Sequence, residues 1–349
     1  MKKTLIPPLV GFLLIGILPV INWTPQSLQW APNSEHARFV NLASAAVPVE
    51  QSDTVLAAFG RGDYQALEDQ FGAILRERKK RSDGHSFLSK AYDELTYDPD
   101  VRYSMEQRLV RLEDWLRSNP SSHFANAMIG SFYVTYAWDA RGGGFGDTVS
   151  ETNYRLFKER LLKARSYLEN AYLADPSDPI VPSALVKVSM GLGDDFAEME
   201  KQFQRAIQAD VLEYCPYKAK LTYLMPKWHG SQELMLSFAR KTARDAPSNS
   251  LAPLILAQAH WEIYERSADK KMYFRQPEVW DEVKSVYSLI CKRFSGVKER
   301  HNWFARAAYL AGDFETAREQ MAFVEKDWSQ RVWGNFADFS RAKAEILGK

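Results

Sequence analysis

The chain has 349 residues, of which 46% are hydrophobic and 13% aromatic. This apolar content is enough for a packed core and excludes a globally disordered chain. The 45 basic and 44 acidic residues leave a formal net charge of +1, so no charge imbalance points to nucleic acid as a partner.

The first 23 residues have the character of a membrane-directing segment. Lys2 and Lys3 precede a stretch from Leu5 to Trp23 without a charged residue, which as a helix is nearly long enough to span a hydrocarbon core. The nearest small-x-small cleavage motif, at 43–45, lies well beyond Trp23, and this favours a retained anchor over a cleaved signal peptide. Residues 1–23 are therefore predicted to be a signal anchor or signal peptide, with 5–23 in the membrane if uncleaved.

The two lysines also predict an orientation. Because positive charges remain on the cytoplasmic side, the chain after Trp23 is expected to cross the membrane. The predicted location is the bacterial inner membrane, facing the periplasm, or a periplasmic or secreted protein if the segment is cleaved. Residues 24–50 carry Pro25, Pro32 and Pro48 with little helical periodicity, and are predicted to be a linker.

From residue 51 the apolar spacing becomes helical, most clearly over residues 163–176. Small and apolar side chains follow there at a four-then-three spacing, at Ala164, Leu168 and Ala171, and an Asp-Pro step closes the segment. This is typical of the second helix of a tetratricopeptide-type hairpin, whose small residues let antiparallel helices approach closely. Similar pairs recur, so residues 51–327 are predicted to form an all-α helical-hairpin solenoid of about six to seven hairpins.

The predicted hairpins follow in chain order. The first occupies about 51–80, and the second is divided by residues 98–100. The third has Ile129, Gly130 and Tyr133 at first-helix positions and about 154–174 as its second helix. The fourth turns at 193–194, the fifth at 225–230, the sixth pairs 254–264 with 279–294, and the seventh turns at 312–314. Residues 328–349 are predicted to be a capping helix over the last open face.

A dense basic run occupies residues 76–81. It follows the apolar helix positions Phe71, Ile74 and Leu75. We interpret it as a solvated helix end, where the helix dipole favours cations. Contact with anionic lipid head groups is the alternative.

Cys215 and Cys291 are the two cysteines of the chain. They are expected to lie roughly two hairpins apart, whereas a disulfide needs α-carbons within about 7 Å. Neither belongs to a C-x-x-C or Cys/His ligand spacing. We predict two separate thiols.

The third hairpin contains an insertion, Asp139–Asn153, that an ordinary repeat lacks. Its glycine-rich part, residues 141–147, follows a helix and lacks both the preceding strand and the Lys-Ser/Thr ending of a phosphate-binding loop, so nucleotide binding is not expected. Long ordered loops in compact repeats are often functional, and this one is a candidate to fold over the concave face. A purely structural turn is the alternative.

Three segments resemble a known family. They are residues 140–154 (ARGGGFGDTVSETNY), 191–194 (GLGD) and 223–231 (YLMPKWHGS), and they are similar to uncharacterised, tetratricopeptide-like bacterial proteins grouped as a domain of unknown function. The resemblance covers about residues 55–325 and rests on R-G-G-G-[FY] and L-M-P-K-W, which the generic repeat does not contain. The family more often has glycine where this chain has His229. The resemblance implies a helical-repeat fold and no established activity.

The candidate contact surface combines the insertion with the L-M-P-K-W segment. Consecutive hairpins bring equivalent ends to one edge of a superhelix, which makes one shared patch of Trp138, Asp139, Arg141, Trp228 and His229 possible. Arginine and tryptophan are also enriched in binding hot spots. The predicted partner-binding residues are Arg141, Phe145, Tyr154, Lys227 and Trp228. In the plainer alternative, both tryptophans plug hairpin ends and Asp139 pairs with Arg141.

No catalytic motif accompanies the array. The six histidines lack a metal-ligand spacing, and there is no G-x-S-x-G sequence, so no catalytic residue, metal or cofactor is predicted. We predict an exported or membrane-tethered scaffold that binds a protein or peptide on its concave face. The alternative is an envelope enzyme or small-ligand binder whose pocket is closed by the 139–153 insertion, with acid-base groups from Asp139, Asp147, Glu151 and His229.

Overall fold

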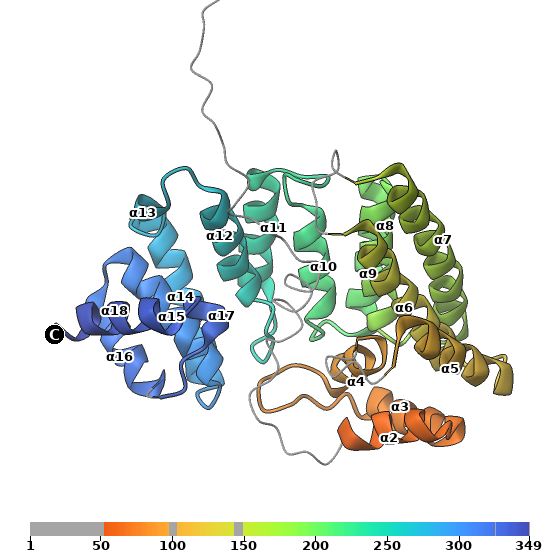
Figure 1. Ribbon diagram of the computed structural model, residues 1–349. Helices are drawn as coiled ribbons and strands as arrows, with labels where there is room; N and C mark the ends of the chain where they lie inside the picture. Colours follow the sequence, from red (N-terminus) through yellow and green to blue (C-terminus); the bar gives the residue numbers. More distant parts are fainter. Residues whose placement is uncertain (1–51, 98–102, 143–148, 325, 349) are drawn as a thin grey trace, which may run out of the picture.

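A computed structural model describes residues 52–97, 103–142, 149–324 and 326–348 (Figure 1). These ranges form helices and no strand, apart from one isolated bridge between Lys80 and Ser86, so the predicted all-α class is confirmed. Within them, no helix is both long and apolar enough to cross a bilayer. The predicted anchor and linker, residues 1–50, lie outside the described residues.

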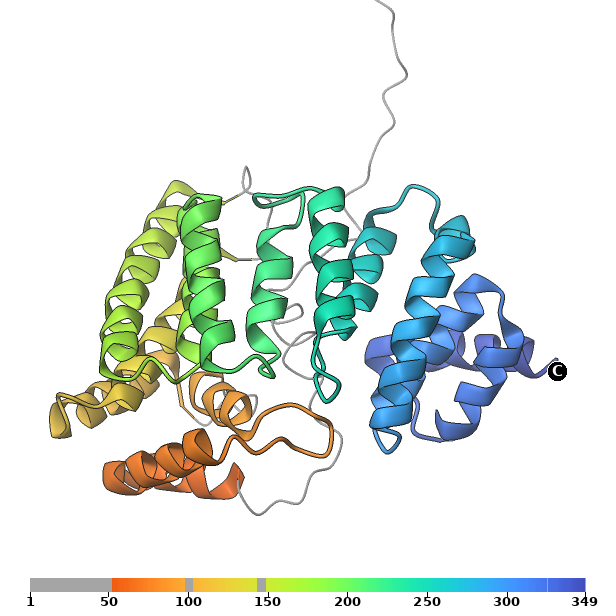
Figure 2. The same ribbon diagram turned by 180° about the vertical axis from the view of Figure 1, so that it is seen from behind.

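Most helices pack on the helices that precede and follow them in the chain, and they stand side by side in both views (Figures 1 and 2). The turn between two helices is short where glycine allows it, as at Gly62, Gly193 and Gly312, which all have positive φ. In chain order the helices are α2 (Ser52–Arg61), α3 (Tyr64–Glu77), α4 (Phe87–Thr96), α5 (Met105–Ser118), α6 (His123–Arg141), α7 (Glu151–Ala174), α8 (Ile180–Leu192), α9 (Phe196–Ala209), α10 (Cys215–Tyr223), α11 (Gln232–Asp245), α12 (Leu254–Arg266), α13 (Lys270–Tyr273), α14 (Pro277–Arg293), α15 (Lys298–Ala311), α16 (Phe314–Val324), α17 (Gln330–Trp333) and α18 (Phe336–Leu347).

The second predicted hairpin differs from the rest. Its helices, α4 and α5, do not form a tight pair; α5 packs mainly on α6, and α4 packs on α2 and α6. Trp115 of α5 explains this placement, because it is fully buried against Phe71 of α3 and donates its indole N–H to Glu68 Oε1 at 2.8 Å. A large buried aromatic side chain thus decides the packing of α5.

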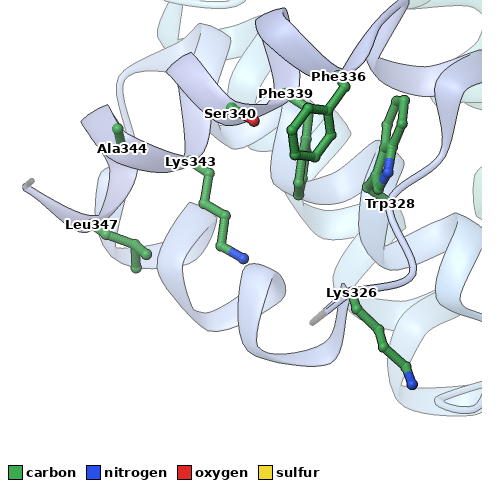
Figure 3. A pocket seen from close by; sticks show the side chains of 8 residues that line it. All are labelled: Lys326, Trp328, Phe336, Phe339, Ser340, Lys343, Ala344 and Leu347. Atoms are coloured by element: carbon green, nitrogen blue, oxygen red, sulfur yellow. The ribbon is translucent and has the colours of Figure 1, made fainter.

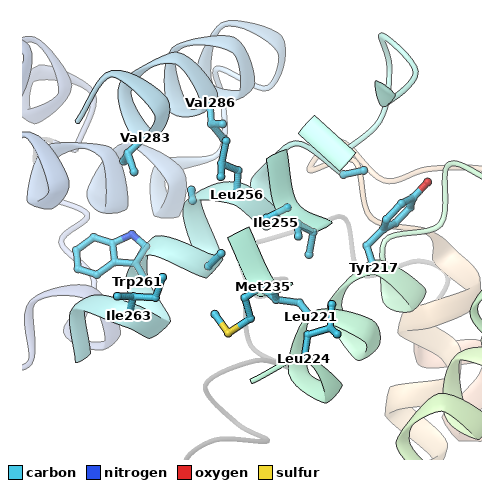
Figure 4. Packing of buried hydrophobic residues seen from close by; sticks show 14 of the residues in the cluster. Tyr217, Leu221, Leu224, Met235, Ile255, Leu256, Trp261, Ile263, Val283 and Val286 are labelled. Carbon is cyan, nitrogen blue, oxygen red and sulfur yellow. The ribbon is translucent and has the colours of Figure 1, made fainter. Parts of the chain in front are cut away.

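The apolar core runs through the whole array. One cluster of buried side chains extends from α2 to α8, and a second extends from α8 to α15. Figure 4 shows the middle of the second cluster, where Leu221, Met235 and Ile255 come from α10, α11 and α12. Helix α8 contributes Val188 to the first cluster and Val186 to the second. A third, smaller cluster joins α15 and α16 to the C-terminal helices.

The pair α6 and α7 makes the closest approach. Gly130 of α6 faces Leu168 of α7, and a Cβ added at Gly130 would lie 2.6 Å from Leu168 Cγ and 3.1 Å from its backbone nitrogen. Ala164, Leu168 and Ala171 on the facing helix are fully buried. The predicted small-residue contact is therefore present, and glycine is required where two backbones meet.

Replacing Gly130 with alanine is expected to destabilise the protein by about 1–3 kcal/mol, because the overpacked methyl group forces α6 and α7 apart. Gly72→Ala is the matched control, since Gly72 also lies inside a helix but its added Cβ meets mainly the flexible end of Arg76. That variant is expected to be neutral or stabilised by up to about 1 kcal/mol through helix propensity. Chemical denaturation of both variants measures the difference; equal stability would contradict the close approach.

The basic run at 76–81 forms a solvated helix end only in its first part, since residues 76–79 are exposed and Arg76 lies in the last turn of α3. Helix α3 ends at Glu77, and Arg78 adopts a left-handed conformation with φ of 48°. The chain then turns back along the molecule, and Arg81 and Asp83 become buried at 5% and 4% exposure, with Arg81 Nη2 3.2 Å from Asp83 Oδ2. The prediction is correct for 76–79 and wrong for Arg81, because nothing in the spacing of the run marks a reversal at Arg78.

We call residues 78–86 the strap, because they run along the connections between later helices (the orange segment between α3 and α4 in Figures 1 and 2). Arg78 donates to the carbonyl oxygens of Ser177 at 3.2 Å and Ala209 at 2.9 Å. Lys80 Nζ lies 3.2 Å from Asp210 Oδ2 and 3.6 Å from Glu213 Oε2. These partners lie in the α7–α8 connection, at the last residue of α9 and in the α9–α10 connection.

The far end of the strap reaches the C-terminal half. Arg300, in the first turn of α15, donates to the carbonyl oxygen of Asp83. Gly84 has φ of +83°, and a Cβ there would lie 2.7 Å from Phe294 Cζ and 3.1 Å from Leu251 Cδ2. Phe294 is held in place because the Arg300 guanidinium lies 4.6 Å from its ring centroid. The strap therefore also touches the α11–α12 and α14–α15 connections.

Gly84→Ala is expected to cost at least about 2 kcal/mol more than Gly312→Ala. Both glycines have a positive φ, +83° and +82°, but an added Cβ at Gly312 meets nothing within 4 Å. Gly312→Ala therefore introduces the backbone strain alone. The difference in stability loss between the two variants measures the contact of the added methyl group with Phe294. Thermal and denaturant unfolding of the two variants provide the measurement, and equal losses would show that the strap is loosely packed.

A buried ionic group holds the ends of α4, α6 and α7 to α8. His123 Nδ1 lies 2.8 Å from the carbonyl oxygen of Ala171, and its Nε2 lies 3.0 Å from Asp178 Oδ2. Tyr92 donates its hydroxyl to the same carboxylate oxygen at 2.5 Å. Both partners of the imidazole are acceptors, so both ring nitrogens carry protons. Burial lowers the pKa of His123, but the hydrogen bond and charge of Asp178 outweigh burial and raise it above its usual value.

Because the folded pKa of His123 is raised, the protonated form is stabilised by folding, and this contribution is complete below about pH 6.5 and lost as pH rises through the raised pKa. The His123→Gln variant is expected to have a free energy of unfolding about 3 kcal/mol lower than that of the unmodified protein at pH 5.5, and the difference is expected to be smaller at pH 8.5. Tyr92→Phe removes a hydrogen bond to Asp178 without removing the imidazole, and is expected to lose a similar amount at both pH values. Urea unfolding of both variants at the two pH values tests this; a pH-independent loss for His123→Gln would contradict it.

The C-terminal cap differs from the single helix predicted for residues 328–349. Its described part forms α17 and α18, separated by Gly334, which has φ of 85°, and by Asn335, which caps α18. Trp333 is anchored because its indole N–H donates to Asn302 Oδ1 at 2.9 Å. This fixed tryptophan and the glycine after it turn the chain, so one continuous helix cannot form.

Candidate functional site

The predicted contact surface lies where α6 ends and α7 begins. Helix α6 ends at Arg141, with Gly142 at φ of 72°. Helix α7 begins at Glu151, three residues before the predicted start, because the Ser150 hydroxyl accepts a hydrogen bond from Asn153 N at 3.2 Å and caps the helix. This end of the pair lies opposite the strap, since α6 and α7 are antiparallel and the strap touches the α7–α8 connection.

The α10–α11 connection brings a tryptophan to the same edge. Trp228 N donates to the Met225 carbonyl oxygen at 2.8 Å. A Cβ added at Gly230 would lie 2.1 Å from the carbonyl oxygen of Leu224, so only glycine fits there. This tight turn directs the Trp228 side chain toward α6.

Trp138, Arg141 and Trp228 form one group, which we call the edge cluster. The two indole centroids lie 5.3 Å apart with their planes at 83°. Arg141 Cζ lies 5.3 Å from the Trp228 centroid and 5.7 Å from that of Trp138, which is cation-π distance for both rings. The structure thus brings together three of the five residues that the sequence analysis considered for one shared patch.

The edge cluster combines a fixed interior with accessible side chains. Trp138 packs against both large core clusters, and Trp228 packs against the second. Tyr154 is 47% exposed, and Lys158 Nζ lies 4.7 Å from its ring. Lys227 is exposed, with Nζ 6.0 Å from the Trp228 ring. The rim is therefore aromatic and cationic.

The electrostatics of this edge are set by burial. Burial lowers the pKa of Arg141 and the nearby Tyr154 opposes this shift, and the guanidinium remains charged. The indole nitrogen of Trp228 is buried without a hydrogen-bond partner. A buried N–H without an acceptor costs free energy, and because this one is enclosed by protein atoms it does not face a ligand.

The other predicted site residues do not join this group as an acid-base centre. Phe145 and Asp147 lie outside the described residues. Asp139 and Glu151 are exposed. His229 Nε2 lies 3.0 Å from the carbonyl oxygen of Met190, and its ring stacks on Tyr223 with centroids 4.6 Å apart. Within the described part of the chain, Asp139, Glu151 and His229 form no hydrogen bond or ion pair with one another.

A half-buried ionisable group between α4, α8 and α10 was missed by sequence reasoning. Burial raises the pKa of Asp93, and the charges of Lys187 and Lys218 oppose this shift. Burial lowers the pKa of Lys218 to about 7. These residues come from three distant helices, and none belongs to a motif, so only the packing of the helices reveals that they interact.

The two cysteines are free thiols, as predicted. Burial raises the pKa of both, that of Cys291 to about 12. A thiol that stays protonated at neutral pH is a poor nucleophile and a poor metal ligand. In the described ranges, no group of three or more His, Cys, Asp or Glu side chains could hold a metal ion.

Comparisons with known proteins do not identify a family for the chain, so any function must be inferred from the geometry described above. No family model and no curated protein matches the chain. The resemblance to tetratricopeptide-like bacterial proteins of unknown function therefore stays a prediction.

Proposed function

We propose that the helices form a tetratricopeptide-like solenoid of helical hairpins. Three features support this. Most helices pack mainly on their neighbours in the chain, Gly130 stands at the close approach of α6 and α7, and glycine turns join α2 to α3, α8 to α9 and α15 to α16. In such arrays, equivalent helix ends share an edge, which offers a long surface for a partner.

We propose further that the protein is a scaffold without chemistry of its own, which binds a protein or peptide on the concave face and holds it at the edge cluster. The observation that carries this proposal is the contact of Arg141 with both Trp138 and Trp228 beside the exposed Tyr154. Aromatic and arginine side chains supply most of the binding free energy at protein interfaces.

The chemistry of the edge cluster also indicates the kind of partner. Arg141, Lys158 and Lys227 place three cations around the aromatic side chains. A peptide segment with an apolar or aromatic side chain and a neighbouring carboxylate would cover the rings and be attracted by the positive charge.

The proposed location follows from the N-terminal sequence. Residues 1–23 act as a signal anchor or signal peptide, and 24–50 tether the helical body at the periplasmic face of a bacterial inner membrane, or precede it in a cleaved, periplasmic or secreted form. Partner capture would then take place outside the cytoplasm.

The enzyme alternative receives less support. It requires at least two of Asp139, Glu151 and His229 to converge on one site, and in the described residues they are exposed or engaged with backbone. The scaffold needs only the contacts already present in the edge cluster.

The proposal is tested with a photo-crosslinking amino acid, p-benzoylphenylalanine, at position 154 of the full-length protein in its native host. Tyr154 is accessible and aromatic, so the replacement is conservative. One dominant protein adduct is expected. Adding Arg141→Ala is expected to reduce this adduct at least about tenfold, which corresponds to about 1.4 kcal/mol of binding free energy.

Two controls make this result specific. The same crosslinker at position 173 samples the opposite end of α7, where Leu173 is 77% exposed, and is expected to give no such adduct. Arg155→Ala removes an exposed arginine next to Tyr154 and is expected to leave the adduct unchanged. Equal adducts from positions 154 and 173, or no effect of Arg141→Ala, would refute the assigned surface.

A further inference from the structure

A groove opens at the C-terminal end of the chain, away from the edge cluster. It has a volume of about 630 Å³ and lies between the segment before α17 and one face of α18 (Figure 3). The lining residues are Lys326, Trp328, Phe336, Phe339, Ser340, Lys343, Ala344 and Leu347. This volume falls within the range of small-molecule sites.

One end of the groove is aromatic. Trp328 and Phe339 stack with centroids 5.6 Å apart and planes at 19°. Phe336 lies 5.6 Å from Trp328 and is 62% exposed. An exposed phenylalanine beside a stacked pair leaves an apolar surface for a further ring.

The charged side chains that line the groove are all cationic. Lys343 extends into the space below α18 in Figure 3, with its Nζ 5.6 Å from the Phe339 ring, whereas Lys326 lies at the margin of the groove and its end points away from the aromatic side chains. Among the described residues that line the groove, none is acidic. The carboxylates nearby on α18 are engaged elsewhere, because Asp338 pairs with Arg341 at 3.2 Å and Glu345 accepts from Tyr309 Oη at 2.7 Å.

The walls of the groove are fixed by the break between α17 and α18. Trp333 is held by Asn302, a fully buried residue of α15. Asn335 caps α18 by accepting a hydrogen bond from Asp338 N at 2.9 Å. Phe339 is buried against the third core cluster. A site with fixed walls loses little conformational entropy on binding.

We propose that this groove binds a small aromatic carboxylate, with the ring against Trp328 and Phe336 and the carboxylate at Lys343, while Lys326 adds positive charge at the margin. The aromatic end supplies the contact for the ring system. The two lysines have no acidic neighbour in the lining and attract the carboxylate of the ligand. This attraction is stronger beside an apolar wall than in open water.

The probe is 2-naphthoate, and its neutral isostere 2-naphthamide is the matched ligand. Isothermal titration of the purified full-length chain is expected to show binding of naphthoate at least tenfold tighter than that of the amide. Raising the salt concentration is expected to weaken naphthoate binding, since both lysines are accessible to solvent. No binding of naphthoate, or equal affinity for both compounds, would overturn the proposal.

Variants locate the site. Lys326→Gln/Lys343→Gln is expected to reduce naphthoate affinity at least tenfold. The control Lys271→Gln/Lys292→Gln removes the same charge from exposed positions on α13 and α14 and is expected to leave affinity unchanged. Phe336→Ala changes a largely exposed side chain and is expected to weaken both probes about threefold. Equal losses in the two lysine pairs would overturn the assignment.

A vesicle-binding experiment distinguishes between a small aromatic carboxylate and a lipid surface as the ligand of the groove. Vesicles of anionic phosphatidylglycerol and of neutral phosphatidylcholine are mixed with the protein and sedimented. If Lys326 and Lys343 are required for binding to the anionic vesicles while naphthoate does not bind, the groove recognises a membrane surface and the proposal is wrong. Naphthoate binding that depends on the two lysines, with vesicle binding that does not, supports it.

Discussion

The strap is the constraint on which the arrangement of the helices depends. In an array of helical hairpins, each unit contacts mainly its neighbours. Here a segment near the start of the chain bonds to residues up to 217 positions away, from Arg78 at Ser177 to Asp83 at Arg300. It touches the connections before α8, α10, α12 and α15. Small rotations between successive pairs, which would otherwise accumulate, are therefore fixed along one edge.

The strap can do this because several of its polar groups have partners in other parts of the molecule. Lys80 faces the carboxylates of Asp210 and Glu213, and Arg300 binds a backbone oxygen of the strap. Burial lowers the pKa of Arg300 to about 10, so it stays charged at neutral pH. A buried cation that lost its partner would cost several kcal/mol. Such contacts make displacement of the strap costly and hold the two halves of the array in register.

The sequence predicts the parts of this molecule that depend on local or repeated signals. Helix ends at Gly193 and Gly312, the contact of Gly130 with α7, and the meeting of Arg141 with Trp228 follow from turn chemistry, spacing and the rule that hairpin ends share an edge. The strap does not follow, because Arg78 is a non-glycine residue with positive φ and its partners are far away in sequence. Trp115 and the Asp93 group depend likewise on distant packing. The break at Gly334-Asn335 had a signal, since glycine followed by a capping residue commonly separates helices.

The two edges of the stack have different physical roles. The edge at the connections between pairs is closed by the strap, whereas the edge at the turn between α6 and α7 carries the cluster of Trp138, Arg141 and Trp228. Trp138 packs against both large core clusters, so it lies at the junction that the strap braces from the opposite side. A braced junction holds the rings and the guanidinium in place before a partner arrives. Binding there would lose less entropy than binding to a flexible surface, and this supports the proposal that the three side chains anchor a partner.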